Sequence, residues 1–589
     1  MKPSKRTKRI PKALDPITLE VVSNRLQEIS RTMEHILFHT GYSTILRESQ
    51  DGSAGITDRE GNVIGGAAGE TIHLTPYVYT VKGVLENYRY DEMEAGDTFV
   101  VNDPYKGGSH HVPDVAVATP VMYRGQVIAF TSSIAHKPDV GGMVPGSSSA
   151  ASREIFHEGL LLPPMKYWSK GKLIKEVDLV IRNNCRTPDL TAGDLRGQAG
   201  CTQVGARMLC ALCDEYGVDT VLQCFAELQN VTEKRLRAEL AILPDGEREA
   251  ESFLDHDSAD PDKPVRIHVR IIKQGSDLTI DFSGCAPQTR GPVNLPQHSA
   301  EASCLVALVS FLDPTIPFNE GLRRAVTFIS PPGKVVHPIH PGPVNHYFPT
   351  NHQVYNCMLS ALSALDPGRA VGEPGGGSGA VAFGYRRTRT GKSYVQYEIM
   401  CTGLGGHDQG DGGSMYLPVL NFTPFTPIEI LETEYPVRVT EFSVRTNSAG
   451  PGKARGGLGY IREYETLDDA ILTARSSQHK HTSKGVLGGR GPIPTRCSVT
   501  LANGDTQVLP TISTIHMKAG DRFKLEQSGG GGYGDPLTRD PGMTLEDVLN
   551  GYVSIEKAAE EYGVVIDPDR LTIDHEATRQ LRQRPQRRG

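Results

Sequence analysis

Clusters of glycine are the feature that most restricts how this 589-residue chain can fold. The sequence contains 63 glycines and 40 prolines, about 17% of all residues against roughly 12% in an average protein. Such an excess favours tight turns and glycine-lined loops over a helical bundle. Between residues 370 and 535 we therefore expect many short strands separated by glycine clusters, at 375–379, 403–413, 450–459, 486–491 and 529–534.

Helical patterns occupy much of the remaining sequence. Asp15-Pro16 is typical of a helix start, with a capping acid followed by proline. Apolar residues at three- and four-residue steps then predict an amphipathic helix over about 17–40. We expect further helices over about 191–242, 350–366 and 544–562, and a strand pair over 264–285 with its turn at 274–276.

These patterns predict a mixed α and β (α+β) fold, built as one large interwoven unit over residues 14–565. Its N-terminal part, about 14–250, is expected to be largely helical, and the glycine-rich part over about 251–540 is expected to be β-rich. A helical end follows at 541–565. The basic residues 1–13 and the polar residues 566–589 are expected to be solvated tails.

Charge and hydropathy exclude several classes of protein. Lys and Arg number 62 against 69 Asp and Glu, a net charge of −7, which argues against nucleic-acid binding. No stretch of 18 apolar residues predicts a membrane span, and the basic start lacks the apolar core of a secretory signal. We therefore expect a cytoplasmic protein. The ten cysteines show no paired spacing, and Cys210 and Cys213 are expected to pack within a helix.

Two common catalytic motifs are missing from the sequence. A P-loop requires glycine five residues before Gly-Lys-Ser/Thr, and Arg386 occupies that position before Gly391-Lys392-Ser393. A nucleophile elbow requires glycine where Ala380 follows Gly376-Gly377-Ser378-Gly379. Neither a P-loop ATP site nor an elbow-type serine nucleophile is expected.

Residues with metal-binding chemistry lie where short apolar runs begin or end in the first third of the chain. His111 and Asp114 precede one such run, and His136 ends another, so we expect them on adjacent strand ends facing one cavity. Two neutral imidazoles and one carboxylate can hold a divalent ion and leave positions open for water and substrate. The alternative is that these histidines only form hydrogen bonds near a glycine turn.

Two other polar clusters have two interpretations each. The segment 47–51 is either a surface helix end or a source of Asp51 as a second carboxylate ligand, which would neutralise a divalent ion. The segment 407–413 is either a glycine-rich turn or a loop beside the substrate.

Short motifs follow one another in order through most of the chain. They are Arg47-Glu48-x-x-Asp51, Asn102-Asp103-Pro104, His111-x-Pro113-Asp114, His136-x-x-Asp139-x-Gly141-Gly142, Glu158-Gly159, Pro163-Pro164, Asp194-Leu195-x-Gly197-Gln198, Glu429-Ile430-Leu431-Glu432, the run from Ser448 to Gly459, and Gly529 to Pro536. Together they resemble the hydantoinase B/oxoprolinase family. This family comprises B-type subunits of ATP-dependent N-methylhydantoinases, the C-terminal part of 5-oxoprolinases, caprolactamase small subunits, and metal-carrying subunits of acetone and acetophenone carboxylases.

The resemblance implies the metal-binding subunit of an ATP-dependent cyclic amidase. A hydantoinase A-type subunit with an actin-like ATP site would phosphorylate the carbonyl oxygen of a ring amide, and the B-type subunit would complete hydrolysis at one divalent ion of zinc, manganese or iron. The resemblance further implies a hetero-oligomer, with two copies of each subunit as one arrangement, and the metal ligands Asp51, His111, Asp114 and His136.

Three residues are candidates for moving protons at this site: His110, Asp139 and Glu48. His110 also competes with His111 as a ligand, because Ser109 and His110 separate the paired glycines from His111, and in the family the glycines usually stand nearer the histidine.

Three other functions fit parts of the pattern. An ATP-dependent ketone carboxylase subunit would use the same fold and ion, and a dependence on bicarbonate would separate it from an amidase. A non-enzymatic scaffold is disfavoured because all proposed ligands are present. A two-His-one-carboxylate iron oxygenase is disfavoured because its motif more often has the spacing H-x-D/E.

Overall fold

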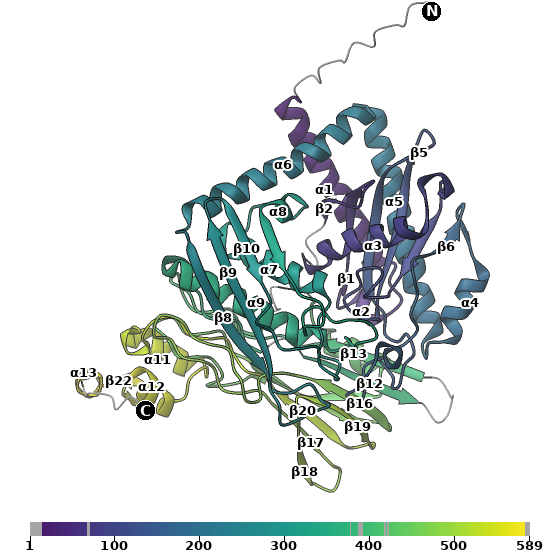
Figure 1. Cartoon of the computed structure of the whole chain (residues 1–589). Coiled ribbons are helices and arrows are strands. Elements are labelled where there is room, and N and C mark those ends of the chain that lie inside the picture. The colour runs from purple at the N-terminus through teal and green to yellow at the C-terminus, as the bar shows by residue number, and fades with distance from the viewer. Residues whose placement is uncertain are drawn as a thin grey trace, which may run out of the picture.

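The computed structural model describes residues 14–66, 71–376, 379–386, 393–416, 420 and 423–583 (Figure 1). These residues form four sheets of at least four strands, with helices between and around them. The predicted mixed α and β class is confirmed. The predicted basic tail, 1–13, and the last six residues lie outside the described part.

The N-terminal part is built on a seven-stranded sheet with the order β2-β1-β5-β4-β3-β6-β7. α1 and α5 pack on one face, and the shorter α3 packs on the other. The strands are Gly52–Asp58, Val63–Gly66, Thr98–Val101, Asp114–Tyr123, Gln126–His136, Met165–Ser169 and Lys172–Leu173, numbered β1 to β7. The helices of this part are α1 Pro16–His39, α2 Thr44–Arg47, α3 Leu74–Asn87, α4 Lys175–Asn183, α5 Pro188–Tyr216 and α6 Val218–Ile242.

α1 forms for the reasons visible in its sequence. The Asp15 carboxylate accepts a hydrogen bond from the Thr18 backbone N–H at 3.0 Å, and Pro16 takes the first helical position. One face of the helix is buried against α5 and β1, through Val22, Leu26, Ile29, Met33 and Leu37. The predicted helix over 17–40 is therefore confirmed. The stretch predicted helical over 191–242 consists of two helices, since Gly217, with φ +83°, interrupts it between α5 and α6.

The second sheet has the order β11-β10-β9-β8 and packs on α7 and α9. Its strands are β8 Gly246–Leu254, β9 Val265–Gln274, β10 Asp277–Asp281 and β11 Val326–Ile329. β9 and β10 are the predicted strand pair, with the turn where it was expected. α7, Gln297–Leu312, and α9, Tyr347–Leu365, are buried around most of their circumference, and the short α8, Gly321–Arg324, lies between them in sequence.

The remaining two sheets face each other as a sandwich in the C-terminal half. One has the order β13-β12-β16-β19 and the other β14-β15-β20-β17-β18, and both contribute aromatic residues such as Phe383, Tyr464 and Phe523 to a common core. The strands are β12 Ala380–Arg386, β13 Ser393–Ile399, β14 Val437–Val444, β15 Tyr460–Thr466, β16 Ala470–Arg475, β17 Arg496–Thr500, β18 Thr506–Leu509, β19 Ile512–Met517 and β20 Arg522–Glu526. α10, Ile428–Glu434, precedes β14.

The glycine clusters pack against one another through backbone hydrogen bonds. Gly530 N–H donates to Gly457 O at 2.9 Å, Gly457 N–H to Leu404 O at 2.7 Å, and Gly531 N–H to Glu373 O at 2.8 Å. A Cβ atom on Gly530 would lie 2.0 Å from Leu404 O, so only glycine permits this approach. The clusters between the strands are thus a packed layer in their own right, which we call the glycine layer (372–376, 403–413, 450–459, 485–491 and 529–534).

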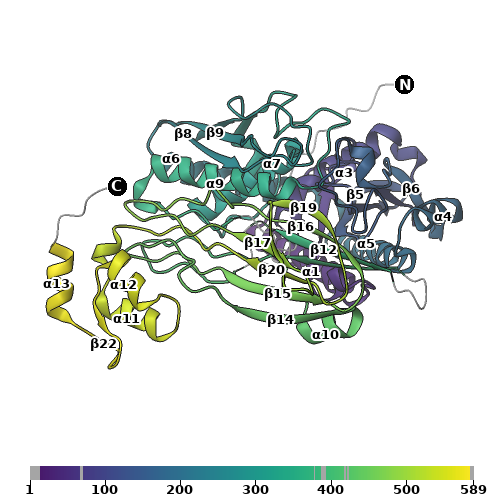
Figure 2. The same ribbon diagram turned by 90° about the horizontal axis from the view of Figure 1, so that it is seen from below.

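A helical unit at the end of the chain attaches to the glycine layer, far from the N-terminal sheet (Figure 2). It contains the predicted helices as α11, Pro541–Leu549, and α12, Ile555–Tyr562. The prediction of a polar tail from residue 566 is wrong as far as residue 583, because β21 (Ile566–Asp567), β22 (Thr572–Ile573) and α13 (His575–Gln583) follow. Arg582 holds α13 in place by donating to the carbonyl oxygens of Tyr562 and Arg539, an anchor that no apolar pattern signals.

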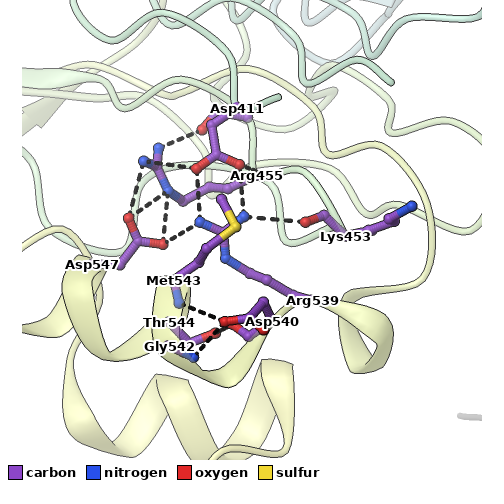
Figure 3. Close-up of polar contacts among 10 residues, drawn as sticks. Asp411, Lys453, Arg455, Arg539, Asp540, Gly542, Met543, Thr544 and Asp547 are labelled. Carbon is purple, nitrogen blue, oxygen red and sulfur yellow. Dashed lines mark hydrogen bonds and ion pairs between the residues drawn. The ribbon is translucent and has the colours of Figure 1, made fainter. Parts of the chain in front are cut away.

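Three buried charges and the partly buried Asp411 join this unit to the glycine layer (Figure 3). Arg539 forms ion pairs with Asp411 at 2.6 Å and with Asp547 at 2.8 Å, and Arg455 pairs with Asp547 at 3.1 Å. Of the two interpretations of segment 407–413, the structure supports the turn, because Asp411 serves this network. No helix in the described part of the chain is long and apolar enough to cross a membrane.

Candidate metal centre

The pairing of two strands brings the predicted metal ligands together. Asp114 is the first residue of β4 and His136 the last residue of β5, and the two face each other across the antiparallel ladder. His111 lies three residues before Asp114 in the loop that leads into β4. One ligand atom from each of these three buried residues lies within 4.8 Å of those from the other two. The expectation that the three share one cavity therefore agrees with the coordinates.

Asn102 ties down the loop that carries His111. Its side-chain amide donates to Val112 O at 2.8 Å and to Leu160 O at 2.9 Å, and its carbonyl oxygen accepts from the Leu162 N–H at 2.6 Å. The fully buried Asn102 side chain thus links the loop, at Val112, to the segment 160–162.

Hydrogen bonds define the tautomer of His111. The Asn345 amide group donates to Ser147 O, so its Oδ1 faces His111 Nδ1 at 3.0 Å; Asn345 O lies 3.2 Å from the same nitrogen. Both neighbours are acceptors, so Nδ1 carries the proton. In the neutral ring, Nε2 then presents its lone pair to Asp114 Oδ1 at 3.2 Å. Two acceptors at this distance require a proton or a metal ion between them.

The remaining ligand atoms of Asp114 and His136 favour a metal ion over a proton between His111 and Asp114. Asp114 Oδ2 and both ring nitrogens of His136 are buried without a hydrogen-bond partner, and a single proton at His111 would leave them so. Burial, reinforced by His111, lowers the pKa of His136 well below its ordinary value, so the ring is neutral. Burial acts to raise the pKa of Asp114, but the contact with His111 outweighs it and lowers the pKa, so the carboxylate is ionised. A neutral imidazole at His136 beside an ionised carboxylate at Asp114 matches the protonation states that a divalent ion requires.

The cavity at this group has a volume of about 30 Å³ and is shared between three parts of the fold. Asp51, His111, Asp114 and His136 line it from the edge of the seven-stranded sheet. The start of α9 contributes residues 346–349, and the sheet of β12, β13 and β16 contributes Tyr397 and Arg475. The Tyr397 ring packs over His136 with the ring centroids 4.3 Å apart.

Comparison with known proteins gives the family. The sequence profile described as hydantoinase B/oxoprolinase matches residues 15–536. The chain belongs to the hydantoinase B/oxoprolinase family. The predicted resemblance is therefore confirmed.

Relatives cover almost the full length of the chain. A protein of Pseudomonas sp., provisionally named as the B-type subunit of a D-/L-hydantoinase, is 34% identical over 97% of this chain and 98% of its own length. The beta subunit of the Pseudomonas jessenii caprolactamase is 31% identical over 94% and 97%. The 5-oxoprolinase of Dictyostelium discoideum is 26% identical over 90% of this chain, which corresponds to 41% of that longer protein.

Solved structures agree with these relatives. The crystal structure of the ATP-dependent caprolactamase of Pseudomonas jessenii superposes with a TM-score of 0.91 at 30% identity, over 97% of this chain and all of the other. The nucleotide-free structure of acetone carboxylase superposes with a TM-score of 0.89 at 19% identity, over 96% of this chain and 82% of the other. The second likeness shows a shared fold.

The other predicted site residues differ in whether they line the cavity of His111, Asp114 and His136. Asp51 lines the same cavity, and its backbone carbonyl accepts from the His136 N–H at 3.2 Å. His110 lies behind the cavity wall, where Nδ1 bonds to the Ser299 hydroxyl at 2.6 Å and the ring stacks on Tyr347. His110 is absent from the clustered group, so the geometry favours His111 as the ligand.

Asp139 and Glu48 are engaged elsewhere. Asp139 accepts backbone hydrogen bonds from Gly141, Gly146 and Arg186 and forms an ion pair with the Arg186 side chain at 3.1 Å. Glu48 pairs with Arg47 at 2.7 Å near the surface. Neither lines the cavity.

Sequence reasoning missed the part of the cavity that distant segments supply. His346, Tyr397 and Arg475 all line it, and Asn345 orients His111. The position of His346 just before the predicted helix at 350–366 was the one available signal. Tyr397 and Arg475 lie on strands whose sequences show nothing beyond ordinary alternation.

Proposed function

We propose that this chain is the metal-binding subunit of an ATP-dependent cyclic amidase, acting on a ring amide whose carbonyl oxygen a partner subunit has phosphorylated. The supporting observation is the contact of His111 Nε2 with Asp114 Oδ1 at 3.2 Å, with unpartnered ligand atoms on Asp114 and His136 beside it. The ligands in the proposal are His111, Asp114 and His136, with Asp51 as the fourth. A zinc, manganese or iron ion suits this donor set.

A divalent ion held there would supply Lewis-acid chemistry, lowering the pKa of water and offsetting negative charge on oxygen. The chain's own residues prepare the site for it. Asn345 holds the His111 ring with Nε2 toward Asp114, and the Tyr397 ring covers His136 and excludes bulk water from that side. Of the three residues predicted to move protons, we retain His110, because its Nε2 has no partner and its ring stacks on the cavity residue Tyr347.

The proposal assigns ATP use to a hydantoinase A-type partner. The hydantoinase and caprolactamase relatives are each named as one subunit of a larger enzyme, and the caprolactamase is described as ATP-dependent. Both facts support a two-subunit enzyme. The substrate class in the proposal is a small cyclic amide of the hydantoin, oxoproline or lactam kind.

Reconstitution tests the proposal. The chain is purified alone and together with its A-type partner, and ring opening and ADP release are measured on hydantoin, 5-oxoproline and caprolactam. We expect ATP-dependent ring opening only when the two proteins are combined, loss of activity with a chelator, recovery with added metal, and no need for bicarbonate. Ring opening by the isolated chain would contradict the division of labour, and a requirement for bicarbonate would favour a carboxylase instead.

A further inference from the structure

Arg475, the last residue of β16, is a buried cation without a carboxylate partner. Only 5% of the residue is exposed. Its Nη1 donates to Asn345 O at 3.1 Å and its Nη2 to the Tyr397 hydroxyl, and no described carboxylate forms an ion pair with it. The fully buried Arg462, in contrast, pairs with Glu398 at 2.9 Å. Because an uncompensated buried charge is costly, Arg475 points to an anion that the described residues do not provide.

The start of α9 converges on the same cavity. His346 directly precedes this 19-residue helix, is fully buried, and has no hydrogen-bond partner at either ring nitrogen. The three residues that follow His346 also line the cavity. The N-terminal end of a helix carries partial positive charge, which favours anions; here Tyr347 N–H already donates to Val344 O and Pro349 has no N–H, so α9 contributes mainly its dipole. An unpartnered imidazole and a helix start thus lie beside the unpartnered guanidinium.

The other charges near the cavity leave Arg475 unbalanced. Asp51, Asp114 and Asp194 lie within electrostatic range of the buried Lys137, and this ammonium and a divalent ion at the metal ligands would balance their three negative charges. Among the residues that the structure describes, Glu158 is a further acid near Arg475, and its two oxygens accept hydrogen bonds from the backbone N–H groups of Val344 and Asn345. Burial raises the pKa of Glu158 to about 8, so it does not supply the missing charge at neutral pH.

We propose that Arg475, Tyr397 and His346 form an oxyanion subsite that holds the phosphoryl group of the activated ring amide next to the metal ligands. This inference rests on the proposed function and names the part of the substrate that this half of the cavity recognises. The planar guanidinium matches two oxygens of a phosphoryl group, and the Tyr397 hydroxyl offers a further polar contact. Because the cavity of about 30 Å³ is smaller than a phosphoryl group, its walls must move apart to admit one. Tyr397 lies against His136, so the subsite directly adjoins the metal group.

Inorganic phosphate, the product that such a step releases, is the probe. Titration calorimetry with the full chain, metal-free and metal-loaded, is expected to show one phosphate site in both forms. Arg475→Met removes the charge and should weaken phosphate binding at least about tenfold. Arg475→Lys keeps the charge but lacks the two parallel donors of the guanidinium, so its phosphate affinity should lie between those of the wild type and Arg475→Met. Arg496→Met, at an exposed arginine on β17, is the matched control and should bind phosphate like the wild type.

The same samples are analysed for metal, so that this inference and the proposed function fail separately. Weakened phosphate binding with unchanged metal content in Arg475→Met supports the subsite. Phosphate binding that depends on Arg475 in a chain that holds no metal also supports the subsite and removes the proposed metal role. Should Arg475→Met fail to fold, Tyr397→Phe and Arg475→Lys carry the same comparison. Absence of phosphate binding in the wild type, equal binding in the Arg475 variants, or binding of bicarbonate in place of phosphate would overturn the inference.

Discussion

Replacing Asn345 with alanine tests how the chain prepares His111 for a metal ion. In the wild type, Asn345 Oδ1 accepts from His111 Nδ1 at 3.0 Å and from the Ser148 hydroxyl at 2.8 Å, while its amide group donates to Ser147 O. Loss of such a supporting hydrogen bond typically lowers metal affinity about 10–100-fold. The backbone Asn345 O still lies 3.2 Å from His111 Nδ1 in the variant. We therefore expect Asn345→Ala to lower the metal affinity by about tenfold, the smaller end of this range.

Competition with a chromogenic chelator measures this affinity. The substitution also leaves a buried hydroxyl and a buried carbonyl unpaired, at about 1–3 kcal/mol each, so stability must be controlled. Ser148→Ala breaks one hydrogen bond to Asn345 and leaves the His111 contact in place, and it should bind metal like the wild type. Asn345→Asp retains an acceptor for His111 and should retain most of the affinity. Wild-type affinity in Asn345→Ala would refute the role assigned to this hydrogen bond.

Three further predictions concern stability. Arg539→Met leaves Asp411 and Asp547 with Arg455 as their remaining partner and should destabilise attachment of the C-terminal helices by about 3 kcal/mol, the lower end for breaking a buried pair; the effect is seen as faster hydrogen exchange in α11 to α13, and unchanged exchange would contradict it. Gly530→Ala places a Cβ 2.0 Å from Leu404 O and should lower Tm sharply, whereas Gly200→Ala in α5 meets nothing within 4 Å and should not. Since burial raises the pKa of Glu158 to about 8 from 4.5, the folded chain holds a proton that the unfolded chain releases. The free energy of unfolding should then fall as pH rises through this range, and denaturant titrations of Glu158→Gln should show a flatter slope.

The clustering of His111, Asp114 and His136 was predictable because its geometry is local to one strand pair. Asp114 and His136 lie at matching ends of β4 and β5, and apolar strand patterns locate such ends in a sequence. The position of a strand end does not predict the direction of a side chain. Asp139, close in sequence to His136, pairs with Arg186 and does not line the cavity.

The opposite wall of the cavity was not predictable from the same reasoning. His346, directly before α9, and Tyr397 and Arg475, on a sheet more than 200 residues after His136, line this wall, and Asn345 contacts His111. Only the packing of the whole unit brings these residues together. The glycine clusters predicted a loop-rich second half, but the backbone pairing that makes them a layer depends on five separated segments. α13 escaped prediction because hydrogen bonds from the partly buried Arg582, rather than an apolar stripe, anchor it.

Metal content of the purified chain tests the central claim most directly. Elemental analysis of the wild type should find about one zinc, manganese or iron ion per chain, and the double variant His111→Ala, His136→Ala should have lost it. His516→Ala, at an exposed histidine on β19, should retain the wild-type content. An equal, near-stoichiometric ion in the wild type and the double variant would contradict the assignment of this site.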